Sequence, residues 1–110
     1  MNVLVVYCHP CGDSFNAAVL KVAVEALVER GHQVRVSDLY KEGFDPVMRF
    51  AEWQTYHDAP QNMQPVREQI ENLKWAEAVV FVYPTWWYGL PAMLKGWLER
   101  VLVPGFAFDI

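Results

Sequence analysis

The feature that most constrains the fold is a strand–helix–strand pattern in the first third of the chain. Val3–Tyr7 is a continuous apolar, mostly β-branched run, typical of a strand buried on both faces. A helical pattern follows over residues 15–27, and Asp13 or Ser14 is placed to cap it. His32–Asp38 then alternates like a second strand. Two strands joined by a helix predict a parallel sheet with a right-handed crossover.

The same kind of pattern continues to the end of the chain. Three- and four-residue spacing predicts that the first helix buries one apolar face, made of Phe15, Ala18, Val19, Val22, Ala23, Ala26 and Leu27. A second helix is predicted from Pro65, Ala78–Tyr83 predicts a fully buried third strand, and a last helix is expected from about Pro91 to Val103. Leu39–Gln64 is irregular and long for a compact domain, so no residue in it is given a role.

These elements predict an α/β fold with a doubly wound parallel sheet in the order 2-1-3. Ligands of such sheets bind beyond the carboxyl ends of the strands, where the strand order reverses. The loops after strands one and three, Cys8–Asp13 and Pro84–Leu90, should therefore line one crevice.

The two loops carry complementary chemistry. The first opens a helix whose N–H groups and dipole suit an anion, and Ser14 and Asn16 add side-chain donors. It contains neither a G-x-G-x-x-G nor a P-loop sequence. The second places Trp86, Trp87 and Tyr88 in one turn, where a planar ligand could stack. Together they predict a flavin nucleotide. The alternatives are that Ser14 is a plain N-cap and that the aromatics lie in the core or in a dimer interface.

Composition and sequence pattern argue against several other classes of protein. The net charge is -4 and no basic stripe is present, which argues against nucleic-acid binding. No apolar run approaches the roughly 20 residues of a membrane span, and no secretory signal precedes the first strand. The two closely spaced cysteines favour a reducing compartment, so we expect a cytoplasmic protein.

At both loops the sequence resembles the NAD(P)H:quinone oxidoreductase family of the flavodoxin-like superfamily. The resemblance is carried by His9-x-x-x-Asp13-Ser14-Phe15-Asn16 and by the longer, more specific run Tyr83-Pro84-Thr85-Trp86-Trp87-Tyr88-Gly89-Leu90-Pro91-Ala92-Met93-Leu94-Lys95-Gly96-Trp97-Leu98-Glu99-Arg100-Val101. Asp38-Leu39-Tyr40 and Gly43-Phe44-Asp45-Pro46 match between them, so the resemblance covers nearly the whole chain.

The resemblance implies a bound flavin, FAD or FMN with FAD slightly favoured, that passes electrons from NAD(P)H to quinones or similar acceptors. By position, His9 and the turn Ser14, Phe15 and Asn16 would hold the phosphate end of the flavin. The ring would be wrapped by Pro84, Thr85, Trp86, Trp87, Tyr88 and Gly89. Trp87 and Phe108 would border the pocket shared by nicotinamide and quinone-like acceptor. No catalytic side chain is assigned, because the flavin carries the hydride chemistry. We also expect a homodimer.

The chain departs from the family in length. Family members continue with further strands and a Gly-rich loop near the flavin, whereas residues 1–110 form one flavodoxin-like domain that stops after the third strand and its helix. The third strand is therefore expected to be an apolar sheet edge, which invites pairing with another chain. One alternative to an enzyme is an inactive fold fragment. Another is an ancillary flavoprotein subunit of the potassium-efflux type, with Trp86, Trp97 and the Trp53/Tyr56 pair facing a partner.

Two rival site hypotheses concern the cysteines. Cys8-His9-Pro10-Cys11 is a C-x-x-C at a strand–helix junction, as in thiol–disulfide oxidoreductases, but Gly12 and Asp13 separate Cys11 from the helix start. A zinc site would need four ligands, and no second paired motif supplies them, so no metal is expected.

Overall fold

The computed structural model describes residues 1–109. The chain forms three strands, five α-helices and one 3₁₀-helix within this range. In chain order they are β1 (Asn2–Tyr7), α1 (Phe15–Glu29), β2 (Gln33–Asp38), α2 (Leu39–Glu42), α3 (Phe50–Gln54), η1 (Gln61–Val66), α4 (Arg67–Trp75), β3 (Ala78–Val82) and α5 (Ala92–Val101). The predicted strands and helices are present, and the last helix ends at Val101 rather than at Val103.

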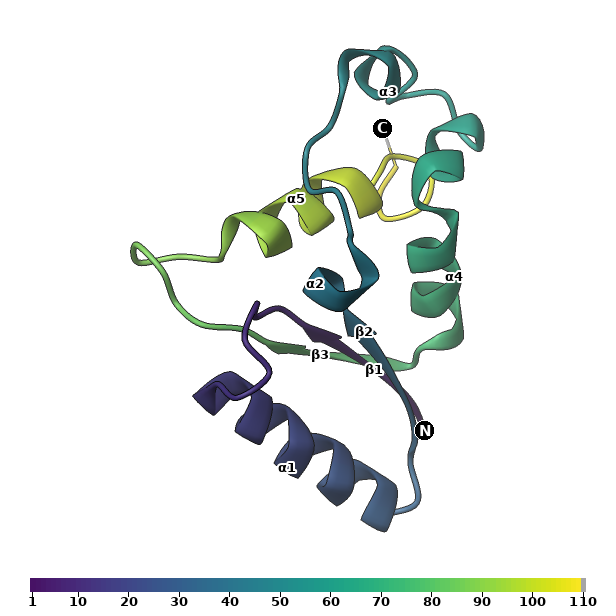
Figure 1. Cartoon of the computed structure of the whole chain (residues 1–110). Helices are drawn as coiled ribbons and strands as arrows, with labels where there is room; N and C mark the ends of the chain where they lie inside the picture. Colours follow the sequence, from purple (N-terminus) through teal and green to yellow (C-terminus); the bar gives the residue numbers. More distant parts are fainter. Residues whose placement is uncertain (110) are drawn as a thin grey trace.

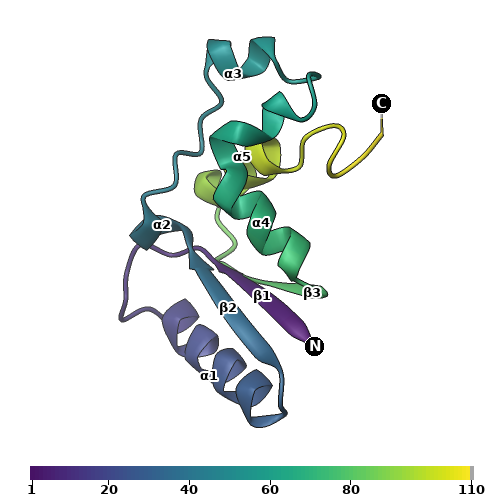
Figure 2. The ribbon, with the colours of Figure 1, turned by 90° about the vertical axis from the view of Figure 1, so that its right-hand side faces the viewer.

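The sheet has the predicted order, β2-β1-β3, and both strand pairs are parallel. Its helices lie in two layers. Figure 1 shows α1 alone on one face, with α2, α4 and α5 on the other, and the turned view in Figure 2 keeps α1 and α4 on opposite sides. No helix among residues 1–109 is long and apolar enough to cross a membrane.

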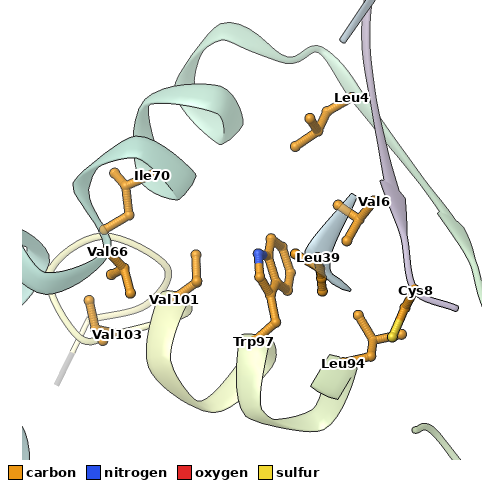
Figure 3. Close-up of a cluster of buried hydrophobic side chains, with 10 residues drawn as sticks. All are labelled: Leu4, Val6, Cys8, Leu39, Val66, Ile70, Leu94, Trp97, Val101 and Val103. Carbon is orange, nitrogen blue, oxygen red and sulfur yellow. The ribbon is translucent and has the colours of Figure 1, made fainter. Parts of the chain in front are cut away.

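The core is built around β1, whose side chains alternate between the two faces. Val3, Val5 and Tyr7 pack toward α1, while the larger cluster on the other face contains Leu4 and Val6. The members of that larger cluster, drawn in Figure 3, are Leu4, Val6, Cys8, Leu39, Val66, Ile70, Leu94, Trp97, Val101 and Val103. A strand flanked on both edges and covered on both faces accounts for the uninterrupted apolar run of β1.

Trp97 is the largest fully buried side chain of this core and belongs to α5. Its indole N–H donates to Oε1 of Gln69 on α4 over 2.8 Å, so the one polar atom of the ring is paired. The hypothesis that Trp97 faces a partner is therefore wrong: its side chain joins α5 to α4 within the chain.

The predictions that β3 and one face of α1 are buried are wrong. In both cases no neighbouring helix or strand in the described part of the chain covers the exposed side chains. β3 is not fully buried, because Val79 and Phe81 are 37% and 41% exposed. On α1 the predicted face is exposed at Phe15, Val19 and Val22. Of the side chains packed against the β1 cluster, Leu27 was predicted, whereas Ala17 and Leu20 lie outside the predicted face. The periodicity correctly identified apolar positions, but α1 has more apolar surface than the three-stranded sheet covers.

The irregular stretch between β2 and α4 is fastened to α5. Arg100 and Glu52 form a bidentate ion pair, with N–O distances of 2.7 to 3.2 Å and side chains only 12% and 15% exposed. The buried Asn62 amide donates to the carbonyl oxygens of Tyr56 and Pro104, at 2.8 and 2.9 Å. Pairing of this kind holds the excursion on the α5 side of the sheet.

Candidate functional site

The carboxyl ends of β1 and β3 lie side by side and bring the two predicted loops together. The Cys8 N–H donates to the Val82 carbonyl over 3.0 Å, which extends the strand pair to the start of both loops. Just beyond, the His9 and Trp86 rings meet edge to face, with centroids 5.8 Å apart. The structure thus places the start of the first loop against the aromatic turn of the second.

The first loop is organised around hydrogen bonds from its own backbone. Nδ1 of His9 accepts from the Cys11 N–H at 3.0 Å, so in the neutral imidazole the proton sits on Nε2, which can donate to an anion. The Ser14 hydroxyl oxygen accepts from the Ala17 N–H at 3.0 Å. Ser14 is therefore an N-cap, as the simpler hypothesis held, and its hydroxyl proton is still available to a ligand. Phe15 is exposed and Asn16 half-buried at the same helix start.

The second loop is a tight hairpin under backbone strain. Trp86 and Gly89 exchange backbone hydrogen bonds of 3.2 and 3.1 Å around Trp87 and Tyr88. These two residues have φ angles of 51° and 61°, in the left-handed region that costs roughly 1–2 kcal/mol for a residue with a side chain. Their side chains are 95% and 97% exposed, so neither belongs to the core. Two bulky aromatics in strained positions facing solvent are typical of a binding site.

The remaining loop residues flank this turn. Pro84 is half-buried, and Thr85 and Gly89 are exposed beside the turn. Phe108, by contrast, is not brought to Trp87. It lies in the C-terminal turn, where the Gly105 N–H donates to its carbonyl over 2.8 Å. Figure 1 shows this turn near the last residues of α5, with the aromatic hairpin at the opposite end of the helix. Within one chain, Trp87 and Phe108 do not border a common pocket.

A cavity of about 390 Å³ lies at the carboxyl ends of β1 and β2. His9, Pro10 and Gly12 line it from the first loop, and the others are residues that sequence analysis did not assign: Tyr7, Asp38, Tyr40 and Lys41. For Asp38 and Tyr40 the signal was the match at Asp38-Leu39-Tyr40, where β2 ends and α2 begins, whereas no local pattern indicated a role for Tyr7 or Lys41. The cavity therefore extends the predicted crevice toward β2 rather than toward the aromatic turn.

The donors around this cavity suit a phosphorylated ligand. The Tyr7 hydroxyl is buried and has no hydrogen-bond partner within residues 1–109, which is costly unless a ligand supplies one. Burial, with a smaller effect of the nearby Cys8 thiol, raises the pKa of Tyr40, so this phenol remains a donor at neutral pH. Lys41 adds a positive charge. With Nε2 of His9, these groups fit the anionic end of a flavin nucleotide.

A larger cavity of about 720 Å³ opens between α2, η1, α4 and α5. Glu42 on its wall accepts from the Ser37 hydroxyl at 2.9 Å and from the Gln69 amide at 3.0 Å. Arg100 is engaged by Glu52. Two charged groups of the larger cavity are thus paired within the chain, whereas the smaller cavity is lined by the first loop and by the Tyr7 hydroxyl, unpartnered within residues 1–109, so we place the functional site at the smaller cavity.

The cysteines do not form a reactive pair. Burial raises the pKa of Cys8 to about 11, and this effect outweighs the opposing backbone hydrogen bond at Leu94. Cys8 therefore stays a protonated thiol at neutral pH, while Cys11 is exposed. This argues against the thiol–disulfide hypothesis. In the described part of the chain, no group of three His, Cys, Asp or Glu side chains could hold a metal ion.

Comparisons with known proteins agree with the observed fold. The family model described as a flavodoxin-like fold matches residues 1–110. A ribosyldihydronicotinamide dehydrogenase-like protein of Penicillium crustosum is 40% identical, over 100% of this chain and 47% of its own length. The ribosyldihydronicotinamide dehydrogenase (quinone) of Mus musculus is 38% identical, over 99% of this chain and 54% of its own length.

A solved structure of a similar protein has the same fold. The NAD(P)H:quinone oxidoreductase from Methanothermobacter marburgensis superimposes with a TM-score of 0.88 at 34% identity, covering 97% of this chain and 54% of that protein. The chain thus spans about half the length of the relatives it matches. With the β2-β1-β3 parallel sheet and a family match along its whole length, the chain belongs to the flavodoxin-like fold family.

Proposed function

We propose that this chain is the flavin-binding part of an NAD(P)H:quinone oxidoreductase, in which a bound flavin passes electrons from NAD(P)H to quinones or similar acceptors. The observation that carries the proposal is the strained, exposed turn at Trp87 and Tyr88, held next to His9 at the carboxyl edge of the sheet. The Mus musculus and Methanothermobacter marburgensis relatives, a ribosyldihydronicotinamide dehydrogenase (quinone) and an NAD(P)H:quinone oxidoreductase, support the reaction class.

The anionic end of the flavin, FAD or FMN, would bind in the first loop. His9 would donate from Nε2, Ser14 from its hydroxyl, and Asn16 from its amide, beside the exposed ring of Phe15. On the other side of the cavity, α2 adds Tyr40 and Lys41. These are neutral or cationic donors, the chemistry that a phosphate requires.

The ring system would lie against the second loop. Pro84, Thr85 and Trp86 lead into the turn, and Gly89 closes it through the backbone bonds to Trp86. When bound, the flavin supplies hydride acceptance and donation. The task of the chain is to orient it: Trp87 and Tyr88 present about their full aromatic surface for stacking and shield the bound ring from water.

Several finer assignments belong to the proposal. We place residues 1–110 in a single flavodoxin-like domain, in the cytoplasm, as part of a homodimer. Phe108 remains a candidate substrate contact only if a second copy brings its C-terminal turn to Trp87, because α5 separates the two within one chain.

Flavin titration of single variants tests the proposal. Lys41→Gln and Tyr7→Phe each remove a donor from the cavity, so each should raise the Kd for FAD or FMN about tenfold, the equivalent of one charge-assisted hydrogen bond. Lys74→Gln is the matched control, since Lys74 is an exposed lysine on α4 and should leave the Kd unchanged. Quenching of flavin fluorescence measures all four proteins. Equal affinities in the four would place the flavin elsewhere.

A second candidate is a flavin-binding ancillary subunit, favoured by an exposed aromatic pair on α3. The Phe50 and Trp53 rings stack with centroids 5.9 Å apart, although they are 69% and 62% exposed. Exposed stacked aromatics are typical of protein interfaces. Rapid reduction of a free quinone by the purified protein would favour the enzyme, whereas co-purification of a membrane protein, lost in Trp53→Ser, would favour the subunit.

A further inference from the structure

A chain of side-chain hydrogen bonds connects α2 to β2, α4 and α5. The Trp97 indole N–H donates to Oε1 of Gln69 at 2.8 Å, and the Gln69 amide donates to Oε1 of Glu42 at 3.0 Å. The Ser37 hydroxyl donates to the other carboxyl oxygen of Glu42 at 2.9 Å. Ser37, Gln69 and Trp97 are at most 7% exposed. We call these side chains, with that of Glu42, the Glu42 network.

Trp97 sets the direction of the hydrogen bonds in the Glu42 network. An indole N–H can only donate, so the oxygen of the Gln69 amide faces Trp97 and the NH₂ group faces α2. Because Gln69 is buried, this NH₂ group needs an acceptor, and a carboxyl oxygen of Glu42 provides it. A carboxyl group at the end of α2 is therefore the partner that the orientation of Gln69 requires.

The Glu42 network holds the second end of a very short helix. α2 is a single turn of four residues that begins where β2 ends (Figure 2), and Glu42 is its last residue. Its first end is held by Asp38, which accepts from the Lys41 N–H at 3.1 Å, and by the buried side chain of Leu39. A helix of this length is not stable by itself. The bonds of Glu42 to β2 and α4 therefore fix how α2 lies on the molecule.

The two residues in the middle of α2, Tyr40 and Lys41, line the smaller cavity. We propose that the Glu42 network positions Tyr40 and Lys41 for the phosphate of a bound flavin. Glu42 and Gln69 are then positioning residues, because both line the larger cavity and neither lines the smaller one. This inference rests on the proposed function, since it assigns the anionic end of the flavin to the smaller cavity.

Gln69→Glu tests the proposal by placing an acceptor against an acceptor. The new carboxyl group could still accept from Trp97, but its other oxygen would face a carboxyl oxygen of Glu42. The amides of Lys41 and Gly43 on α2 should then exchange with solvent about tenfold faster, while those of β1 keep their protection. Hydrogen exchange measures this without any flavin.

The same variant should distinguish between flavins. The Kd for FMN should rise about three- to tenfold, because Tyr40 and Lys41 no longer lie in place for the phosphate. The Kd for riboflavin, which has no phosphate, should change less than about twofold. Quenching of flavin fluorescence measures both. A general loss of structure would weaken the two ligands equally, so the difference between them reports positioning.

Exchanging the two side chains should rescue the variant. In Glu42→Gln/Gln69→Glu the amide lies on α2, where it can donate to the carboxyl group on α4 and accept from Ser37. Every hydrogen bond of the Glu42 network is then restored, and the net charge is that of the original chain. The exchange of α2 amides and the Kd for FMN should return to within about twofold of the original values.

Two further variants complete the set. Gln64→Glu is the matched control, because Gln64 is exposed on η1 and lines the same larger cavity outside the Glu42 network. It should change α2 exchange and both Kd values less than about twofold. Glu42→Ala removes the carboxyl group without adding charge. It should speed α2 exchange and weaken FMN alone, and it replaces Gln69→Glu if circular dichroism shows that Gln69→Glu does not fold.

Three results would overturn the proposal: equal losses of affinity for FMN and riboflavin, no recovery in the double variant, or unchanged α2 exchange in both Gln69→Glu and Glu42→Ala. If the original chain binds neither FMN nor riboflavin, the proposed function fails, and the phosphate role of α2 fails with it. The exchange rates then still show whether the Glu42 network holds α2, so the two failures are distinguishable.

Discussion

At the residue scale, Gly96 is the position with the least freedom to change. It lies on α5 where Pro46 crosses the helix, and a Cβ there would overlap the Cα, Cβ and carbonyl oxygen of that proline. Most of the clash is with backbone, so no flexible side chain can move aside. Gly96 therefore allows the β2–α4 excursion to lie directly on α5, close to the Arg100–Glu52 ion pair.

Gly96→Ala should accordingly lower the free energy of unfolding by about 1–3 kcal/mol, the usual cost of overpacking. Urea unfolding followed by circular dichroism measures this. Gly12→Ala is the control, because nothing lies within 4 Å of a Cβ at that position, and its effect should stay within about 0.5 kcal/mol. A loss below about 1 kcal/mol for Gly96→Ala would show that the excursion moves easily on the helix.

At the element scale, the hairpin at Trp86–Gly89 combines poor turn residues with exposed aromatics. Both central residues have positive φ, the geometry of a two-residue turn in which Asn-Gly is preferred. A chain selected for stability alone would not place Trp87 and Tyr88 there. The strain is explained if the two rings serve a ligand.

The double variant Trp87→Asn/Tyr88→Gly should separate stability from binding. Replacing both residues with favoured turn residues should raise the free energy of unfolding by about 1–2 kcal/mol. Loss of both rings should raise the Kd for flavin at least about tenfold. Trp87→Ala keeps the positive φ on a residue with a Cβ and should weaken binding without the gain in stability. Stabilisation with unchanged flavin affinity would separate the turn from the site.

The three strands and the helices α1, α4 and α5 could be predicted from the sequence, but the short helices α2, α3 and η1 and the covered faces could not. Periodicity and the handedness of parallel crossovers were sufficient for the order β2-β1-β3. Periodicity identifies an apolar stripe without showing which neighbour covers it, so Val22 and Phe81 were expected to be buried and are exposed. Lys41 was missed for a different reason: it enters the cavity through the position of α2 after β2, which no local pattern reports.

At the scale of the whole molecule, functional groups and uncovered surfaces are separated. The donors around His9 and the aromatic turn lie at the carboxyl ends of the strands. The apolar surfaces of β3 and α1 lie along the sides of the sheet and of its helix layer. The candidate flavin site is thus separate from the exposed apolar side chains of β3 and α1.

The most direct test of the flavin site is the visible absorption spectrum of the purified 110-residue chain after incubation with FAD or FMN and desalting. If the two loops form the site, a flavin spectrum survives desalting at about one flavin per chain, and NAD(P)H bleaches it. A colourless protein after both incubations would contradict the account, because the loops would then lack the affinity that their donors and aromatic rings are proposed to supply.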